Sequence, residues 1–358
     1  MSALGAPAKK TPGTEHSDPG AVSTPRARVQ EWLAAIRDEG GPPAGMDRTI
    51  LRGAQLIGAD LSNLDLSGYD LSGADLSRAD LAHTRLMSAN LRGTVLFEAN
   101  LRDSVLLSAD LTGANLSSCS AENAGFESAD LTDATFFSAS LRGATFIKAT
   151  LQGTDLRATD LQHARLRDAD LRNADFSRSN LQHADLEGSS VDGATFVDAE
   201  LPHAHLRGLR GYTAANWIGA DVHDINFTGA YLTRRTIMDQ NYLHEFRIQS
   251  RINRVIYWLW WVSSDCGRSF LRWGAWIIIV LMLFAFLFTF VALDYGEYPT
   301  YMSSVYFSVV TLTTLGYGDV VPASPMAQVL AIIEVVFGYV MLGGLLSIFA
   351  NKMARRAD

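Results

Sequence analysis

The sequence contains little cysteine, and its first two thirds contain no long apolar run. Only two of the 358 residues are cysteine, Cys119 and Cys266, so neither a disulfide framework nor a cysteine-rich metal site is expected. The N-terminal residues lack the apolar stretch of a secretory signal peptide, so we expect no cleaved signal. Nucleophile elbows and phosphate-binding loops are also missing from this polar part, and it contains no convincing metal-ligand spacing. We therefore expect no enzymatic activity, and we expect the polar part to lie in a reducing, cytoplasmic compartment.

Acidic and basic residues are separated along the chain. The formal net charge is −8, but residues 47–232 hold 25 acidic and 15 basic residues, a net of −10. Residues 233–272 hold 3 acidic and 7 basic residues, a net of +4. The polar part therefore carries an excess of acidic residues, and the segment next to the apolar last third carries an excess of basic residues.

A long stretch of the chain repeats with a period of five. From Leu51 to Leu206, every fifth position is Leu, Phe or Val at 31 of 32 sites, with Ala121 the exception. Positions 54–204, two residues earlier in each unit, hold Ala at 21 of 31 sites and Ser, Thr or Cys at another 8. Helices repeat every 3.6 residues and strands every 2, so a sustained period of five predicts a solenoid. The frame slips by one residue before Trp217, which predicts a bulge and then one last coil.

Units such as Ala74–Arg78 (ADLSR) and Ala169–Asn173 (ADLRN) are similar to the A-(D/N)-L-x-x units of the pentapeptide repeat family. The resemblance implies an all-β, right-handed quadrilateral β-helix with four units per coil, which we place at residues 46–232. Some free-standing members of that family are thought to mimic DNA. The acidic face is better interpreted here as a solvated surface, so no nucleic acid partner is expected. A cytoplasmic protein partner or ligand of the repeats stays open.

Both ends of such a solenoid expose an apolar cross-section that needs a cap. Val29, Leu33 and Ile36 lie on one face of a candidate helix, so residues 26–45 are predicted to be the N-terminal capping helix. Residues 1–25 are rich in Pro, Gly, Ser and Thr and are predicted to be disordered.

Residues Thr311–Asp319 read TLTTLGYGD and lie between apolar stretches. Gly316 and Gly318 accept positive φ at little cost, so this segment can turn successive backbone carbonyls toward one axis. It resembles the potassium channel signature sequence, in which carbonyl rings from four loops replace the hydration shell of the ion. The resemblance implies a homotetrameric, potassium-selective channel with no cofactor beyond K+. The implied filter consists of Thr314, Leu315, Gly316, Tyr317 and Gly318, with K+ held by the backbone carbonyls of Thr314, Leu315, Gly316 and Tyr317.

Two apolar segments are long enough to cross a bilayer core of about 30 Å as helices. Residues 273–293 are predicted to be the outer helix and 323–350 the inner helix of an all-α transmembrane pore domain at 273–358. Residues 301–311 fit a pore helix before the filter at 314–319, because non-helical backbone at this depth needs surrounding protein. Basic residues precede the first span and follow the second: Arg268, Arg272, Lys352, Arg355 and Arg356. The positive-inside rule then puts both termini in the cytoplasm, and we expect a bacterial inner membrane.

Residues 233–272 connect the repeats to the first span. Arg247, Arg251 and Arg254 precede a cluster of tryptophans, so we predict a basic amphipathic linker helix at the lipid interface. A plain linker helix fits the same residues equally well. Membrane lipid is the expected partner of this region.

Residues near the filter are expected to support it. In the potassium channel family the positions eight and seven before the filter threonine are often tryptophan, and here they are Tyr306 and Phe307. Tyr306 can hydrogen-bond Asp319, and Thr313 adjoins the filter, so these four residues are the predicted filter support.

Glycines in the inner helix are candidates for a gating hinge. Gly338 lies 19 residues after Asp319, the spacing at which related two-span channels place a hinge glycine. Gly343 and Gly344 form a second flexible or close-packed point, and close packing is the alternative role for all three. Glu334 is an ionisable residue in the middle of this span, where it is costly and usually functional. It either bonds the pore helix behind the filter or faces the cavity.

His163, His183 and His203 are spaced by twenty residues, as is His83 in the same register. In coils of twenty residues they would stack at steps of about 4.8 Å and could form a proton-sensing or metal-binding ladder. The alternative is a solvated turn position that tolerates imidazole. Two other functions of the whole chain stay open, a membrane-tethered scaffold that the pore domain merely oligomerises and a weakly selective cation channel. The gating stimulus has no sequence signature.

Overall fold

The computed structural model describes residues 29, 31–35, 47–296 and 300–357, and for 351–357 it describes the backbone only. The chain forms two compact units, Met1–Asn241 and Tyr242–Asp358. The predicted disordered tail and most of the predicted capping helix lie outside the described residues.

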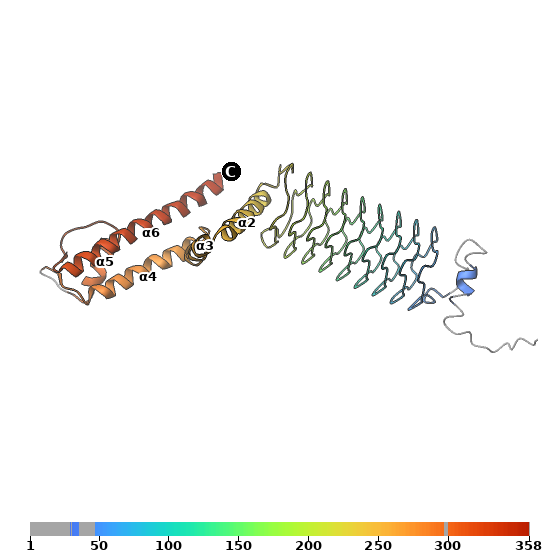
Figure 1. Ribbon diagram of the computed structural model, residues 1–358, viewed down its shortest axis with the longest axis horizontal. Coiled ribbons are helices and arrows are strands. Elements are labelled where there is room, and N and C mark those ends of the chain that lie inside the picture. Colours follow the sequence, from blue (N-terminus) through green and yellow to red (C-terminus); the bar gives the residue numbers. More distant parts are fainter. Residues whose placement is uncertain (1–28, 30, 36–46, 297–299, 358) are drawn as a thin grey trace, which may run out of the picture. The chain divides into compact units, whose positions relative to one another are not determined.

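The first unit is a β-helix-like stack of coils (Figure 1). Parallel β-bridges join residues twenty positions apart, from Gln55 with Asp75 to Ser190 with Arg210. Backbone hydrogen bonds join the same neighbouring coils, and the Leu161 N–H donates to the Asn180 carbonyl oxygen over 2.7 Å. The predicted coil of twenty residues is confirmed, because each coil contains four of the five-residue units.

The inside of the stack is apolar, as the period of five predicts. The residues at the Leu, Phe or Val position are fully or almost fully buried. Most of the small residues two positions earlier in the chain are buried as well. Identical rings stack where the same position repeats: Phe126 on Phe146 and Phe176 on Phe196, each pair with centroids 4.9 Å apart. Since each coil buries its inward residues only against the next coil, the core is continuous along the stack.

Each five-residue repeat turns at a residue with positive φ, which lies two positions after the inward Leu or Phe. From position 53 to 208 this φ lies between +54° and +72°, for example +61° at Asn63 and +69° at Gly153. Gly, Asn, Asp and His are the residue types that most readily adopt this conformation. The fifth position of the A-(D/N)-L-x-x unit therefore has a backbone reason for its composition.

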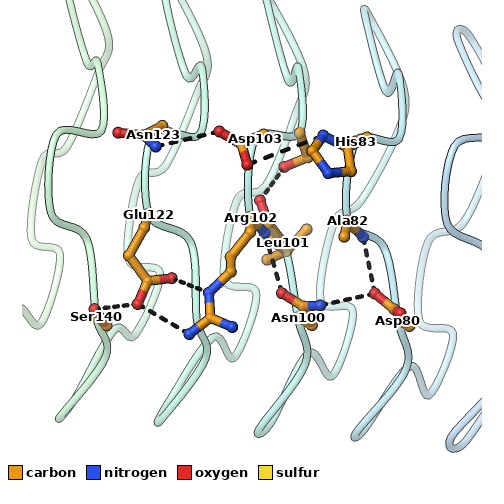
Figure 2. A network of polar contacts seen from close by, with 11 residues as sticks. Asp80, Ala82, His83, Asn100, Leu101, Arg102, Asp103, Glu122, Asn123 and Ser140 are labelled. Carbon is orange, nitrogen blue, oxygen red and sulfur yellow. Dashed lines mark hydrogen bonds and ion pairs between the residues drawn. The ribbon is translucent and has the colours of Figure 1, made fainter.

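Carboxylates next to the inward residues also serve the backbone (Figure 2). The Asp80 carboxylate accepts the Ala82 N–H over 3.1 Å and the Asn100 side-chain amide of the next coil over 2.8 Å. One coil further on, Arg102 donates to Glu122 over 2.9 Å. Such Asx turns and side-chain contacts between coils give many of the acidic residues a structural role. The acidity of the coil stack therefore does not require a separate, basic binding partner.

A buried tryptophan closes the N-terminal end of the stack. Residues 29 and 31–35 are helical, Val29 and Trp32 are buried, and the Trp32 ring lies 6.2 Å from that of Tyr69. Trp32 is not among the residues on which the cap was predicted, although it lies three residues after Val29 and four before Ile36 and so fits the same helical face.

The other end of the stack shows the predicted frame slip. The bridge offset changes from 20 to 21 between Ser190 with Arg210 and Thr195 with Asn216, so one residue is inserted there. Helix α2 (Tyr231–Gln249) then covers the last coils, with Ile237 fully buried. Its Gln240 side chain accepts the Trp217 N–H over 2.9 Å and donates to the Ala215 carbonyl over 2.9 Å. Two side-chain amide contacts thus satisfy backbone groups that a further coil would otherwise pair.

The single linker helix predicted over 233–272 is wrong. The structure has α2 and a separate α3 (Arg251–Ser264), because Ser250 is extended and its hydroxyl accepts the Asn253 N–H as an N-cap. Asp265, with φ of +52°, ends α3.

The second unit contains three further helices and two short strands. Helix α4 (Phe270–Phe288) begins before the predicted outer helix at 273–293, because Ser269 caps its first turn. It also ends earlier than predicted, with Thr289 as its C-cap. Helix α5 (Ser303–Leu312) matches the predicted pore helix closely, and α6 (Pro325–Ala357) begins at a proline and extends past the predicted inner helix. Strands β1 (Leu293–Asp294) and β2 (Val321–Pro322) pair antiparallel. Among the described residues, two helical segments are long and apolar enough to span a membrane, Phe270–Phe288 and Pro325–Ala350.

Candidate ion-conduction site

The predicted filter segment, residues 314–319, follows α5 after Thr313, the C-cap of this helix. This helix packs against both α4 and α6, which lie side by side (Figure 1). The Thr314 N–H donates to the Thr311 carbonyl and the Leu315 N–H to the Val310 carbonyl, each over 3.0 Å. The C-terminal turn of α5 therefore holds the first filter residues.

Alternate filter residues have left-handed backbone. The φ angles are +57° at Thr314, +55° at Gly316 and +78° at Gly318. Positive φ was expected at the glycines, but not at Thr314, since a β-branched residue rarely adopts it. In an ordinary strand successive residues point to opposite sides. Alternation of left-handed residues breaks that rule and allows neighbouring carbonyls to turn to one side.

Two aromatic residues of α5 make contacts beside this segment, Tyr306 with the segment and Phe307 with α4. The Tyr306 hydroxyl donates to the Asp319 carboxylate over 2.5 Å, as predicted. Phe307 is buried and packs edge-on against Phe288 of α4, with centroids 4.8 Å apart. The Thr313 hydroxyl caps the end of the helix by donating to the Val309 carbonyl over 2.6 Å.

The predicted filter segment and the flanking helices expose much surface in the single chain. Residues 314–319 are all exposed, and the side chains of Leu315 and Tyr317 are 59% and 67% exposed. Apolar side chains along α4 and α6 are also exposed, among them Ile278, Phe286 and Ile332. Bare apolar surface of this extent needs lipid or further copies of the chain to cover it.

Gly338 allows α6 to approach the end of α5. A Cβ at this position would lie 2.2 Å from the Leu312 carbonyl oxygen, which is backbone. Gly344 is also a close contact, since a Cβ there would lie 2.3 Å from the ring of Trp273. The Trp273 indole donates to the Met341 carbonyl over 2.7 Å. A Cβ at Gly343 would meet no atom within 4 Å, so the close-packed role falls on Gly338 and Gly344 and hinge motion stays a prediction.

Replacing Gly338 by alanine is expected to destabilise the second unit by up to about 3 kcal/mol, the usual range for overpacking. The added methyl group would overlap backbone, which cannot move without shifting α5. Gly343→Ala is the matched control, because it makes the same change in the same helix in open space and gains about 1 kcal/mol of helix propensity. Thermal unfolding of the detergent-solubilised protein measures both. Equal melting temperatures for the two variants would contradict the close contact.

The three histidines stack as their spacing predicts. The ring centroids of His163 and His183, and of His183 and His203, are 4.8 Å apart. All three occupy the turn position with positive φ, where histidine is well tolerated. Desolvation first, and then repulsion from neighbouring imidazoles, lower the pKa of His183. Among the described residues there is no group of three or more His, Cys, Asp or Glu placed to hold a metal ion. Proton sensing and a solvated turn position that tolerates imidazole both stay open.

Comparison with known proteins separates the chain into two parts. Residues 275–355 match the ion channel family, residues 119–196 match the pentapeptide repeat region, and residues 49–86 and 65–103 match pentapeptide repeats.

Curated relatives of this chain include potassium channels. Two-pore potassium channel 5 of Arabidopsis thaliana is 33% identical over 91 residues, covering 25% of this chain and 22% of the relative. Calcium-gated potassium channel TvoK of Thermoplasma volcanium is 39% identical over 85 residues, covering 23% of each chain. The chain thus spans about a quarter of the length of the curated relatives it matches.

Among solved structures, the repeats are similar to HetL of the cyanobacterium Nostoc sp. strain PCC 7120, a pentapeptide repeat protein. The identity is 27%, the TM-score is 0.32, and the match covers 54% of this chain and 96% of HetL.

Proposed function

Because the C-terminal part is an ion-channel pore domain related to potassium channels and the N-terminal part is a pentapeptide-repeat region, we propose that the chain is one of four identical subunits of a potassium-selective channel. The ion channel family is a family of transport proteins and not of enzymes. The observation that carries the proposal is the segment Thr311–Asp319, which continues from α5 in the same unit as two apolar, membrane-spanning helices. In this proposal the repeat region is a right-handed, four-sided β-helix with a regulatory or docking role.

K+ is the transported substrate in this proposal. Carbonyls of Thr314, Leu315, Gly316 and Tyr317 from four copies would replace its hydration shell, and the alternating backbone of the segment supports that role. Helix α5 ends at Leu312, so the partial negative charge of its C-terminus lies beside the first filter residue and favours a cation there. The exposed side chains of Leu315 and Tyr317 would be covered by neighbouring subunits.

The direct test is a bi-ionic measurement on the full-length protein in planar bilayers. With potassium on one side and sodium on the other, we expect a reversal potential far from zero, because the carbonyl rings compensate the dehydration of K+ better than that of Na+. A reversal potential near zero would point to a weakly selective cation channel. A silent bilayer with an intact tetramer would favour the scaffold function instead.

We place both chain ends and the repeats on the cytoplasmic side of the membrane. Arg268 and Arg272 lie at the start of α4, and Lys352, Arg355 and Arg356 follow the span in α6, which agrees with the positive-inside rule. The exposed apolar residues of α3, among them Ile252, Trp258 and Leu259, fit the interfacial layer of the bilayer.

The stacked histidines predict a pH response of the repeat region. A lowered pKa in the folded state means that the unfolded chain binds the proton more readily, so stability falls as the pH drops below about 6.5. Replacing His163, His183 and His203 by glutamine should reduce this loss between about pH 7 and pH 5, measured as melting temperature. The pKa of His223 shifts in the opposite direction, because its hydrogen bond with Asp221 raises that pKa. His223 is the same residue in the wild type and in the triple variant, so it does not contribute to the difference between them. If the loss of stability survives the triple substitution, the stack is only a tolerant turn position.

A further inference from the structure

Glu334 is a fully buried carboxyl group within the span of α6. Its side chain is 0% exposed, and one of its oxygens, Oε2, has no hydrogen-bond partner. The other oxygen, Oε1, is hydrogen-bonded to the Ser308 hydroxyl of α5. The carboxyl group therefore faces the back of the pore helix.

The Ser308 hydroxyl lies between two oxygen atoms. Besides Glu334 Oε1, it contacts the Leu281 carbonyl oxygen of α4 over 3.0 Å. A serine hydroxyl has one proton and a backbone carbonyl only accepts. If Ser308 donates to Leu281, the proton of the second contact must come from Glu334. An ionised Glu334 would leave one of the two contacts as a pair of acceptors without a proton.

Within the described parts of α4, α5 and α6 that span the membrane, no positive charge is available to stabilise an ionised Glu334. From Trp273 to Phe288 in α4, throughout α5 and from Pro325 to Ala350 in α6, the sequence contains no other Asp, Glu, Lys, Arg or His. The remaining titratable groups of these segments are Tyr306, whose hydroxyl is bonded to Asp319, and the exposed Tyr339. A carboxylate without a counter-ion is costly at this depth, and its unpaired Oε2 would add to that cost.

We propose that Glu334 is a proton-binding site of the pore domain. The neutral carboxylic acid donates to the Ser308 hydroxyl, which donates to the Leu281 carbonyl, so one bound proton connects α6, α5 and α4. Ser308 lies one helical turn before Leu312, where α6 also contacts α5 through Gly338. Glu334 is thereby a positioning residue for the helix that carries the filter.

Infrared spectroscopy of the full-length protein tests the bound proton without any measurement of conduction. At pH 7 we expect the carbonyl stretch of a protonated carboxylic acid, shifted in D2O and lost in Glu334→Gln. The matched control is Glu245→Gln, because Glu245 is exposed in the same unit and its removal should leave this band unchanged. Ser308→Ala should move the band, since the acid loses its acceptor. Absence of the band from the wild type at pH 7 would overturn the proposal.

Potassium flux in liposomes tests the positioning role, which rests on the proposed channel function. Glu334→Ala should lower flux by about tenfold, the factor expected for leaving one buried polar partner unsatisfied. Glu334→Gln should restore most of that flux, because its amide can still donate to Ser308. At alkaline pH the wild type should lose flux together with the infrared band, and Glu334→Gln should not. If both proteins respond to pH alike, the positioning role is overturned. If no variant conducts, the channel function fails while the infrared result still decides the proton site.

Discussion

Leu161→Lys is expected to abolish the cooperative folding of the repeat region. Leu161 is fully buried, and its backbone pairs with the next coil. An ammonium group at this position would lie in an apolar interior without a counter-ion, which costs several kcal/mol. That is a large share of the roughly 5–15 kcal/mol by which folded domains are stable. Because each coil is supported only by its neighbours, the damage should spread along the stack.

Asp160→Asn is the matched control for this substitution. Asp160 is only partly buried, and its carboxylate accepts the Gln162 N–H over 3.1 Å, a bond that the asparagine oxygen can keep. Its contact with Arg142, at 3.6 Å, is a surface ion pair worth little. Thermal melts followed by circular dichroism compare the two variants. A similar fall in melting temperature for both would refute the division of each unit into an inward and an outward residue.

Gly316→Ala is expected to abolish potassium flux while the subunits still assemble. Gly316 has φ of +55°, and an L-residue in the left-handed region costs about 1–2 kcal/mol. In the proposed tetramer this strain would act four times around one axis, where a small shift of each carbonyl removes the ring that replaces ion hydration. The packing of α4, α5 and α6 does not involve this Cβ position, which has no neighbour within 4 Å in the chain.

Gly274→Ala serves as the control for Gly316→Ala. Gly274 lies in α4 without positive φ, and a Cβ there would meet no atom within 4 Å, so flux should stay near that of the wild type. Flux into liposomes and the oligomer size in detergent are the two measurements. Wild-type flux in Gly316→Ala would show that the left-handed backbone of the filter is not required for conduction.

Features that depend on residues close together in the chain could be read from the sequence. The period of five can be recognised by comparing neighbouring five-residue repeats. The slip before Trp217 can be recognised because that period continues afterwards. The pore helix and the Tyr306–Asp319 bond were also predictable, since both lie within a few turns of the filter glycines. The proposed role of the filter itself rests on nine consecutive residues.

Contacts between distant residues required the tertiary structure. The side chain of Gln240 replaces a strand for Trp217, Ser308 connects Glu334 to Leu281, and Gly338 meets the end of α5. Each of these pairs a single polar or small residue with a partner between 23 and 27 positions away. Such contacts leave no periodic pattern, because they arise only when helices pack and every buried polar group must find a partner. The period of five therefore determined the coil stack, and two long apolar segments with the nine-residue motif determined the second unit. Packing decided which side chains close the coil stack and support the pore helix.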